Sequence, residues 1–219
     1  MSPGLALKPR QMSNGQFQSS NVFVVHSRKL KFREVKLIGS ILHDAWLLLE
    51  FDSDIAAFCE RPPLDVELCG HGGRKRAFDF WISKVNGSQA GIIVFGSSKQ
   101  DQGVTTEQLS ESVSSSRTPC EIWHESDVLR RNLFLRNLKQ MQPYLSCESG
   151  YSADVAEDVD LYIQQRSERS ASLEDLFQRF SQVHRTYLTA GVFAKFHAGR
   201  VKADLESAPL SIHTRWQQR

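Results

Sequence analysis

The sequence predicts a mixed α+β core followed by a small helical domain that ends in a β-hairpin. In the first two thirds of the chain, an amphipathic helix is followed by a strand, a strand containing an aspartate, an apolar run, a further strand and a helix. The last third contains two helical patterns and then two alternating segments. The composition, 40% hydrophobic and 24% charged, is that of an ordinary globular protein.

The net charge and the apolar segments exclude several functional classes. A formal net charge of +2 is too small to indicate nucleic-acid binding by itself, so any such argument depends on local clusters. No stretch has the length and apolarity of a membrane span or a signal peptide. The four cysteines form no C-x-x-C pair, which favours reduced thiols. We therefore expect a soluble, cytoplasmic protein.

The first half of the chain provides most of the predicted core. Residues 1–21 are rich in Ser, Gly, Gln and Pro and are predicted to be a disordered tail. Residues 37–58 are predicted to be helical, with Ser40 as the N-cap, because their apolar positions form one stripe. The turn Arg61-Pro62-Pro63 ends that element. Strands are then expected at 63–69, 76–85 and 91–97, with the first two joined by a Gly-rich turn.

The next segment is polar and rich in serine. We predict a loop with a short helix near 105–113, a strand at 120–125 and a helix over 126–145 that ends near Pro143. The acids that follow at 154–160 are interpreted as a solvated face.

The C-terminal segment has the sequence pattern of a winged helix-turn-helix. Helices are predicted at 172–180 and 184–199, followed by strands at 200–205 and 210–216. In that interpretation the second helix reads DNA, and Arg200 and Lys202 begin the wing. The alternative is a helical cap whose hairpin binds a protein.

Asp79 is the first candidate for a site residue, because a carboxylate between Phe78 and Phe80 on a predicted strand is costly to bury. An acid at a strand end in a mixed α/β core suits a Mg²⁺-dependent phosphodiesterase, in which hard oxygen ligands hold the metal and a lysine orients the water. The alternative is an acid that faces solvent or pairs with one of the three cations Arg74, Lys75 and Arg76.

Three short motifs occur in the order and spacing of one known family: Glu50-Phe51-Asp52, Glu60-Arg61-Pro62 and Phe78-Asp79-Phe80. Together they resemble the TnsA family, the endonuclease subunit of heteromeric transposases. The segments WHESDVLRRNLFLRNLKQM and AGRVKADLESAPLSIHT are similar to later parts of that family, so the resemblance extends from about Arg33 to the C-terminus.

The resemblance implies a fold, an activity and partners. The fold would be a restriction-endonuclease-like mixed sheet over residues 22–145, followed by a helical, winged-helix-like domain over 150–219. The activity would be Mg²⁺-dependent cleavage of DNA at transposon ends. The implied partners are that DNA, a DDE-type transposase subunit that cuts the other strand, and an AAA+ ATPase regulator, without a membrane.

The family's catalytic positions match this sequence only in part. Asp79 matches the strand aspartate and is the surviving candidate metal ligand. The helix glutamate falls at His43, while the acid and lysine of the next strand fall at Val94 and Gly96. One carboxylate alone does not hold Mg²⁺ against its hydration shell, so the resemblance implies a degenerate site.

Migrated residues provide an alternative. His43 or its neighbour Asp44 could replace the helix glutamate, although one helical step turns a side chain by roughly 100°. Lys99 lies three residues after Gly96 and could replace the lysine by means of its flexible side chain.

Basic residues form the candidate DNA-binding surface, because Lys and Arg contact phosphates without regard to sequence. These candidates are Arg28, Lys29, Lys31, Arg33, Arg74, Lys75, Arg76, Arg200 and Lys202.

Three functional hypotheses follow. The first is a TnsA-like subunit that binds DNA ends and the partner transposase with an impaired or lost nuclease site. The second is an active Mg²⁺-dependent endonuclease that cuts at transposon ends with migrated residues. The third is a DNA-binding regulator unrelated to transposition.

Overall fold

The computed structural model describes residues 7–13, 21–96, 98–116, 118–145 and 151–219. Its contacts divide the chain into two compact units, and each is described by itself. The first contains Met1–Leu49 and Asp54–Arg130, and the second contains Glu50–Ser53 and Arg131–Arg219. The architecture is mixed α+β with a mixed four-stranded sheet, in agreement with the predicted class.

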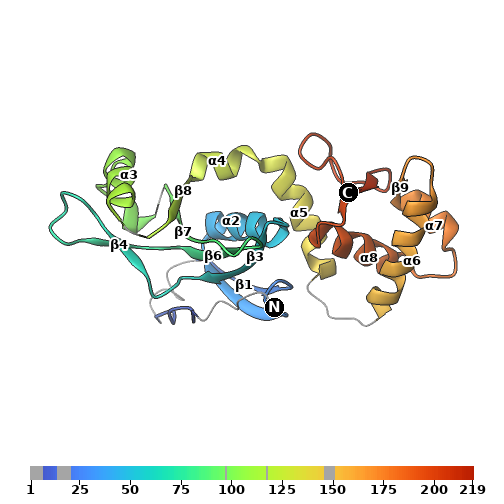
Figure 1. Ribbon diagram of the computed structural model, residues 1–219, viewed down its shortest axis with the longest axis horizontal. Helices are drawn as coiled ribbons and strands as arrows, with labels where there is room; N and C mark the ends of the chain where they lie inside the picture. Colours follow the sequence, from blue (N-terminus) through green and yellow to red (C-terminus); the bar gives the residue numbers. More distant parts are fainter. Residues whose placement is uncertain (1–6, 14–20, 97, 117, 146–150) are drawn as a thin grey trace. The chain divides into compact units, whose positions relative to one another are not determined.

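The four-stranded sheet forms the centre of the first unit. Its strand order is β3 (Ile55–Glu60), β6 (Phe80–Lys84), β7 (Gln89–Phe95) and β8 (Cys120–His124). Strand β6 runs antiparallel to both β3 and β7, and β8 runs parallel to β7. Five consecutive residues of β7 are buried, as expected for a strand covered on both faces. Helix α2 (Ser40–Phe51) lies across this sheet (Figure 1).

Two hairpins accompany the sheet. Strands β1 (Val22–Ser27) and β2 (Arg33–Ile38) pair with each other, and neither strand is predicted from the sequence. Strands β4 (Asp65–Glu67) and β5 (Lys75–Ala77) form a hairpin that projects from the sheet, with α3 near it (Figure 1).

Two predicted elements of the core are wrong. The helix expected over 37–58 ends at Phe51, and Ile55–Glu60 forms strand β3. The polar residues 52–54 interrupt the apolar stripe, and pairing with β6 then determines the conformation of the next six residues. The single strand expected over 76–85 is also divided. Its first part pairs with β4 and its second with β3 and β7, so Asp79 lies at the break.

The predicted disordered tail is also wrong for residues 7–13. The amide of Arg10 donates a hydrogen bond to the carbonyl of Arg61 (2.8 Å), and Leu7 packs against a core cluster around Phe78. The remainder of the predicted tail, apart from Asn21, lies outside the described residues.

The polar segment after β7 contains two short helices, the 3₁₀-helix η1 (Lys99–Asp101) and α3 (Thr106–Ser115), and the second confirms the predicted helix. Strand β8 is confirmed as well. The helix expected over 126–145 is two helices, α4 (Glu125–Arg130) and α5 (Asn132–Leu145), with Pro143 in the last turn of α5.

The second unit is built from helices and a three-stranded antiparallel sheet of order β10-β11-β9. Its elements after α5 are α6 (Tyr151–Gln165), β9 (Ser170–Ser172), α7 (Leu173–Arg179), α8 (Arg185–His197), β10 (Val201–Lys202) and β11 (Arg215–Gln218). The two predicted helices are confirmed, and α8 stops before Gly199, whose φ of +70° favours glycine. The predicted strands pair as expected but are shorter, and α6 is a helix that the sequence analysis did not assign.

The core of the second unit surrounds Trp216, which is fully buried against Phe193 and Phe196 of α8. No helix in the described ranges has both the length and the apolarity to cross a membrane. Cys59, Cys69 and Cys120 are free thiols, and Cys147 lies outside the described residues.

Candidate nuclease-like site

The backbone of Asp79 is held between two strands of the central sheet. Its amide donates to the carbonyl of Ile92 on β7 (2.9 Å), and its carbonyl accepts from the amide of Arg61, just after β3 (2.8 Å). The residue is 8% exposed. The carboxylate is therefore fixed at the start of β6 and almost removed from water.

The carboxylate of Asp79 binds Arg76. Nη2 of Arg76 lies 2.8 Å from Oδ2 of Asp79, and Nη1 lies 3.4 Å from Oδ1. The amide of Val94 on β7 also donates to Oδ2 (2.8 Å). Arg76 is itself only 1% exposed, so this is a buried ion pair completed by a backbone hydrogen bond. The sequence-based alternative that Asp79 pairs with a cation of the preceding segment is confirmed for Arg76.

A second carboxylate, that of Asp101 in η1, binds the other side of the same guanidinium. Nε of Arg76 donates to Oδ1 of Asp101 (2.8 Å), and the amide of Gly96 donates to Oδ2 (3.1 Å). Asp101 is 6% exposed. The guanidinium therefore lies between two buried carboxylates and is held by charge-assisted hydrogen bonds on both sides.

The electrostatics follow from this arrangement. Burial raises the pKa of Asp79, while the charge and hydrogen bond of Arg76 and the amide of Val94 oppose that rise. Burial lowers the pKa of Arg76, but the carboxylates of Asp79 and Asp101 outweigh it, so the net direction is upward. The guanidinium therefore stays charged and is the permanent counterion of the two acids.

The residues present do not fit a magnesium site. Both oxygens of Asp79 already face the guanidinium of Arg76. Within the described ranges, no three His, Cys, Asp or Glu side chains gather closely enough to hold a metal ion. Mg²⁺ needs oxygen ligands in near-octahedral geometry and dehydrates reluctantly, so a position occupied by a cationic side chain offers it no ligand set.

Val94 on β7 and Gly96 after it stand at the positions of the TnsA-family acid and lysine, and they have other roles in this chain. Val94 is 4% exposed, and its backbone amide, not an acid, contacts Asp79. A Cβ atom added to Gly96 would lie 2.7 Å from Cβ of Glu125. A lysine at this position therefore requires Glu125 to move.

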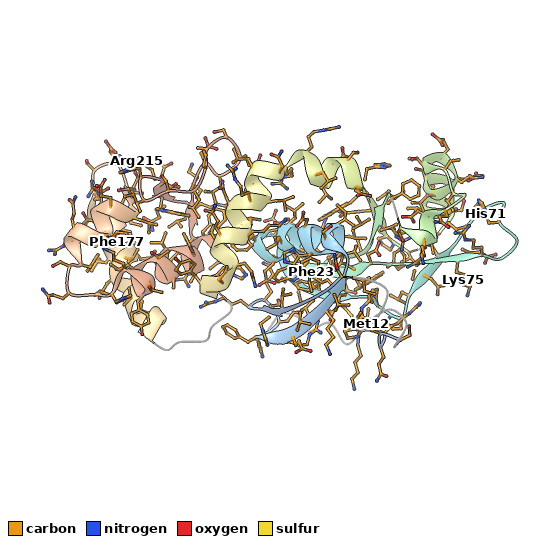
Figure 2. The ribbon with its side chains drawn as sticks, turned by 180° about the vertical axis from the view of Figure 1, so that it is seen from behind. Met12, Phe23, His71, Lys75, Phe177 and Arg215 are labelled. Carbon is orange, nitrogen blue, oxygen red and sulfur yellow. The ribbon has the colours of Figure 1, made fainter. Side chains whose placement is uncertain are left out.

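The residues considered as migrated ligands lie in other environments. The ring of His43 stacks on Phe23 of β1 (centroids 4.6 Å apart), and its Nδ1 lies 3.4 Å from Oδ1 of Asp44. Figure 2 shows Phe23 beside helix α2. Lys99 is exposed on η1, whereas Asp101 of the same short helix binds Arg76.

Most of the predicted DNA-binding cations of the first unit are engaged in the protein. Arg76 is buried, so its prediction as a DNA contact is wrong. Arg33 forms a bidentate ion pair with the buried Glu60 (2.9 and 2.5 Å), and Lys29 donates a hydrogen bond to the carbonyl of Ile55 (2.7 Å). Arg74 donates to two backbone carbonyls of the η1 region.

The remaining cations of this unit are more accessible. Lys75 lies in the projecting hairpin (Figure 2), where it is 3.7 Å from Asp65. Arg28 lies over the ring of Phe32. Lys31 is exposed at the tip of the β1–β2 hairpin.

In the second unit, the predicted recognition helix α8 is largely covered. From Leu188 onward its residues are buried or half-buried, and only its first turn, 185–187, is exposed. Lys195 is buried in an ion pair with Asp160, which corrects the interpretation of Asp160 as part of a solvated face. Arg200 lies 3.8 Å from the same acid, while Lys202 is exposed.

The loop between β10 and β11 is attached to α5 through Asn137, which is fully buried. Its amide nitrogen donates to the carbonyls of Leu205 and Ala208 (2.8 and 2.9 Å), and its amide oxygen accepts from the amide of Leu210 (2.9 Å). The ion pair between Arg131, the residue directly before α5, and Glu206 also holds the loop (2.5 Å). The loop that a winged helix would insert into DNA is therefore fastened to its own domain.

Comparison of the chain with models of known protein families and with curated proteins finds no match in either. The resemblance to the TnsA family therefore stays a prediction from the sequence motifs.

The sequence analysis missed Asp101. It named Arg76 as one of three possible partners of Asp79 but also counted it among the candidate DNA contacts, because it stands in a basic run. Asp101 lies in a polar loop, where an isolated acid has no distinguishing pattern. For Arg76 the sequence signal is the presence of three consecutive cations directly before a buried strand, which indicates that one of them can turn inward.

Proposed function

We propose that this protein is a TnsA-like subunit of a DNA transposition machine in which a fixed ion pair replaces the nuclease metal site. The observation that carries the proposal is the guanidinium of Arg76 bound between Asp79 and Asp101. The order of the sequence motifs supports the family assignment, and the aspartate at the start of a central strand is the position at which such a nuclease holds its metal.

Replacement of a metal ion by a guanidinium explains the loss of chemistry in this proposal. A catalytic metal lowers the pKa of a bound water and polarises the phosphoryl oxygen. A guanidinium neutralises the same carboxylate but coordinates no water and stays protonated at any physiological pH. Asp79 would then stabilise the end of the sheet at which β6 begins, without taking part in hydrolysis.

DNA binding in this proposal is provided by exposed cations of the first unit. The tip of the β1–β2 hairpin supports it, because both Lys31 and Phe32 have positive φ values (57° and 61°). Non-glycine residues in that region are strained, and such strain concentrates at functional sites. The tip exposes Lys31 to solvent, where a phosphate could reach it.

For the second unit we propose a winged-helix-like fold that binds the partner protein. The chain order helix, strand, helix, helix, strand, strand and the sheet order β10-β11-β9 support this part of the proposal. Coverage of α8 and the attachment of the loop by Asn137 argue against insertion into DNA. A pocket of about 520 Å³, whose apolar lining includes Tyr144, Phe177, Phe193 and Ile212 beside polar residues such as Gln140 and Arg185, provides a mixed surface for a protein partner.

The test of the proposed function combines cleavage and binding. Wild type and Asp79→Ala are incubated with supercoiled plasmid in Mg²⁺ or Mn²⁺, and their affinity for a fluorescent 30-base-pair duplex is measured by anisotropy. We expect salt-dependent duplex binding by the wild type and no nicking by either protein. Nicking that Asp79→Ala abolishes would instead support the active endonuclease.

A second arm addresses the partner. The transposase-like protein encoded beside this gene, where one exists, is co-purified with wild type and with Phe177→Glu, which places a charge in this pocket. We expect retention with the wild type and loss with the variant. Duplex binding without any such neighbouring gene would favour the DNA-binding regulator unrelated to transposition.

A further inference from the structure

Arg61 occupies an unusual backbone position directly beside the candidate site. Its φ is +45°, a left-handed conformation that non-glycine residues rarely adopt. Two hydrogen bonds hold it there: its amide donates to the carbonyl of Asp79 and its carbonyl accepts from the amide of Arg10 (both 2.8 Å). The conformation is strained for any residue with a side chain, so the sequence keeps an arginine where glycine would be easier.

In the described part of the chain, the guanidinium of Arg61 lacks the paired carboxylate that neutralises Arg33 and Arg76. Arg33 is paired with the buried carboxylate of Glu60, and Arg76 is paired with two buried carboxylates. Arg61 is half-buried, and in the described part of the chain its Nε is buried without a hydrogen-bond acceptor. Glu60 is near enough to favour its charge, but both oxygens of Glu60 are already bound by Arg33.

Burial without an acceptor has an electrostatic cost. Desolvation lowers the pKa of Arg61, whereas the pKa of Arg33 and that of Arg76 are raised by their carboxylate partners. The Nε of Arg61 is buried, so an anion from solvent reaches only the terminal nitrogens. A partly desolvated guanidinium without a carboxylate partner is stabilised by an anion whose oxygens accept from those terminal nitrogens.

We infer that Arg61 binds a phosphate group of the DNA backbone at the edge of the sheet beside Asp79. The inference rests on the proposed DNA-binding function and adds a specific contact to it. The strained conformation holds the guanidinium at the end of β3, in register with the start of β6, since Glu60 pairs with Phe80. The phosphate thus lies at the edge where the carboxylate of Asp79 is neutralised by Arg76.

The experiment uses the full chain and a substitution that separates structure from binding. Arg61→Gly removes the guanidinium and relieves the backbone strain, so its thermal midpoint is expected to equal or exceed that of the wild type. Arg61→Lys retains the positive charge but lacks the planar guanidinium that can donate two parallel hydrogen bonds. Arg130→Ala, which removes an exposed cation of the same unit, controls for the change in net charge.

Affinity for a 30-base-pair duplex is measured at several salt concentrations. One lost phosphate contact lowers the slope of log K against log salt by about 0.9, which corresponds to about eightfold weaker binding at 0.1 M salt. We expect that loss for Arg61→Gly with an intact fold, a partial loss for Arg61→Lys and a smaller change of slope for Arg130→Ala.

The outcomes are distinguishable. Duplex binding by the wild type with an unchanged slope in Arg61→Gly overturns the inference and leaves the proposed function standing. A lowered thermal midpoint in Arg61→Gly overturns it as well, since the arginine would then stabilise the fold. Absence of duplex binding by the wild type overturns both.

Discussion

The guanidinium of Arg76 places one positive charge in a space that contains two carboxylates, so the group of three has one negative charge in excess. Each acid also accepts a hydrogen bond from a backbone amide, and these bonds help to stabilise the buried charges. The amide of Val94 donates to Asp79, and the amide of Gly96 donates to Asp101. Removal of the cation leaves both acids buried without a counterion, and that is far more costly than the net benefit of the pair itself.

We therefore predict that Arg76→Met lowers the free energy of unfolding by about 3–5 kcal/mol. Urea denaturation followed by circular dichroism measures it. The control is the triple variant Arg76→Met, Asp79→Asn, Asp101→Asn, in which neutral amides keep an acceptor for each backbone amide. We expect it to recover most of the loss, and a loss below about 1 kcal/mol in the single variant would contradict the buried network.

At the residue scale, the sequence predicted the importance of Asp79 but not its environment. A carboxylate between two aromatic residues on a strand is a local signal that needs no structure to detect. The partner Asp101 lies 22 residues further along, in a loop whose path depends on tertiary contacts. No periodicity or spacing relates the two acids, because the cation that joins them belongs to a hairpin strand.

At the scale of elements, the sequence predicted those with regular periodicity and missed those defined by pairing. The apolar residues of α2 recur at helical spacing, and those of β7 form a continuous run, so both elements are recognised from the sequence. The segment Ile55–Glu60 continues the apolar character of the helix, so only the partner strand β6 distinguishes it. The hairpin of β1 and β2 escaped prediction because its tip uses Lys31 and Phe32 at positive φ in place of glycine.

Asn137 links two elements, and its removal has a local consequence. We predict that Asn137→Ala frees the loop between β10 and β11, because the carbonyls of Leu205 and Ala208 and the amide of Leu210 lose their partner. Each buried group left unsatisfied costs about 1–3 kcal/mol. Hydrogen exchange is expected to accelerate at the Leu210 amide. The Val94 amide, in the first unit, is the internal control, and protection of Leu210 equal to the wild type would contradict the prediction.

The start of α7 has a pH-dependent cap. Asp175 accepts from the amide of Ser172, and this backbone hydrogen bond is the main reason that its pKa lies below the usual value of 3.8. A lowered pKa in the folded state stabilises the protein above 3.8, and that contribution is lost as the pH falls through the folded-state value.

We therefore expect wild type to unfold at higher urea than Asp175→Asn at pH 6, and the difference to shrink at pH 2.5. The asparagine retains an acceptor without a titrating charge, so it isolates the electrostatic contribution. An equal difference at the two pH values would show that the charge of Asp175 does not matter.

At the scale of the whole molecule, the contacts assign α5 to the second unit, although the sequence grouped it with the first. The helix contributes Leu135, Leu138 and Met141, all buried, together with Asn137. We predict that a fragment of residues 150–219 stays unfolded, because it lacks these side chains. Circular dichroism and one-dimensional NMR measure it, and a cooperative thermal transition in the fragment would contradict the assignment.

The second unit also takes four residues, Glu50–Ser53, from the middle of the first unit's sequence. Among them Glu50 bonds to His197 of α8 at 2.9 Å, with both side chains buried. During synthesis on the ribosome, Glu50 emerges nearly 150 residues before the histidine that completes its environment. The pair therefore forms only after the end of the chain has been synthesised, and a gene rearrangement that moved residues 131–219 to another protein would separate His197 from this carboxylate.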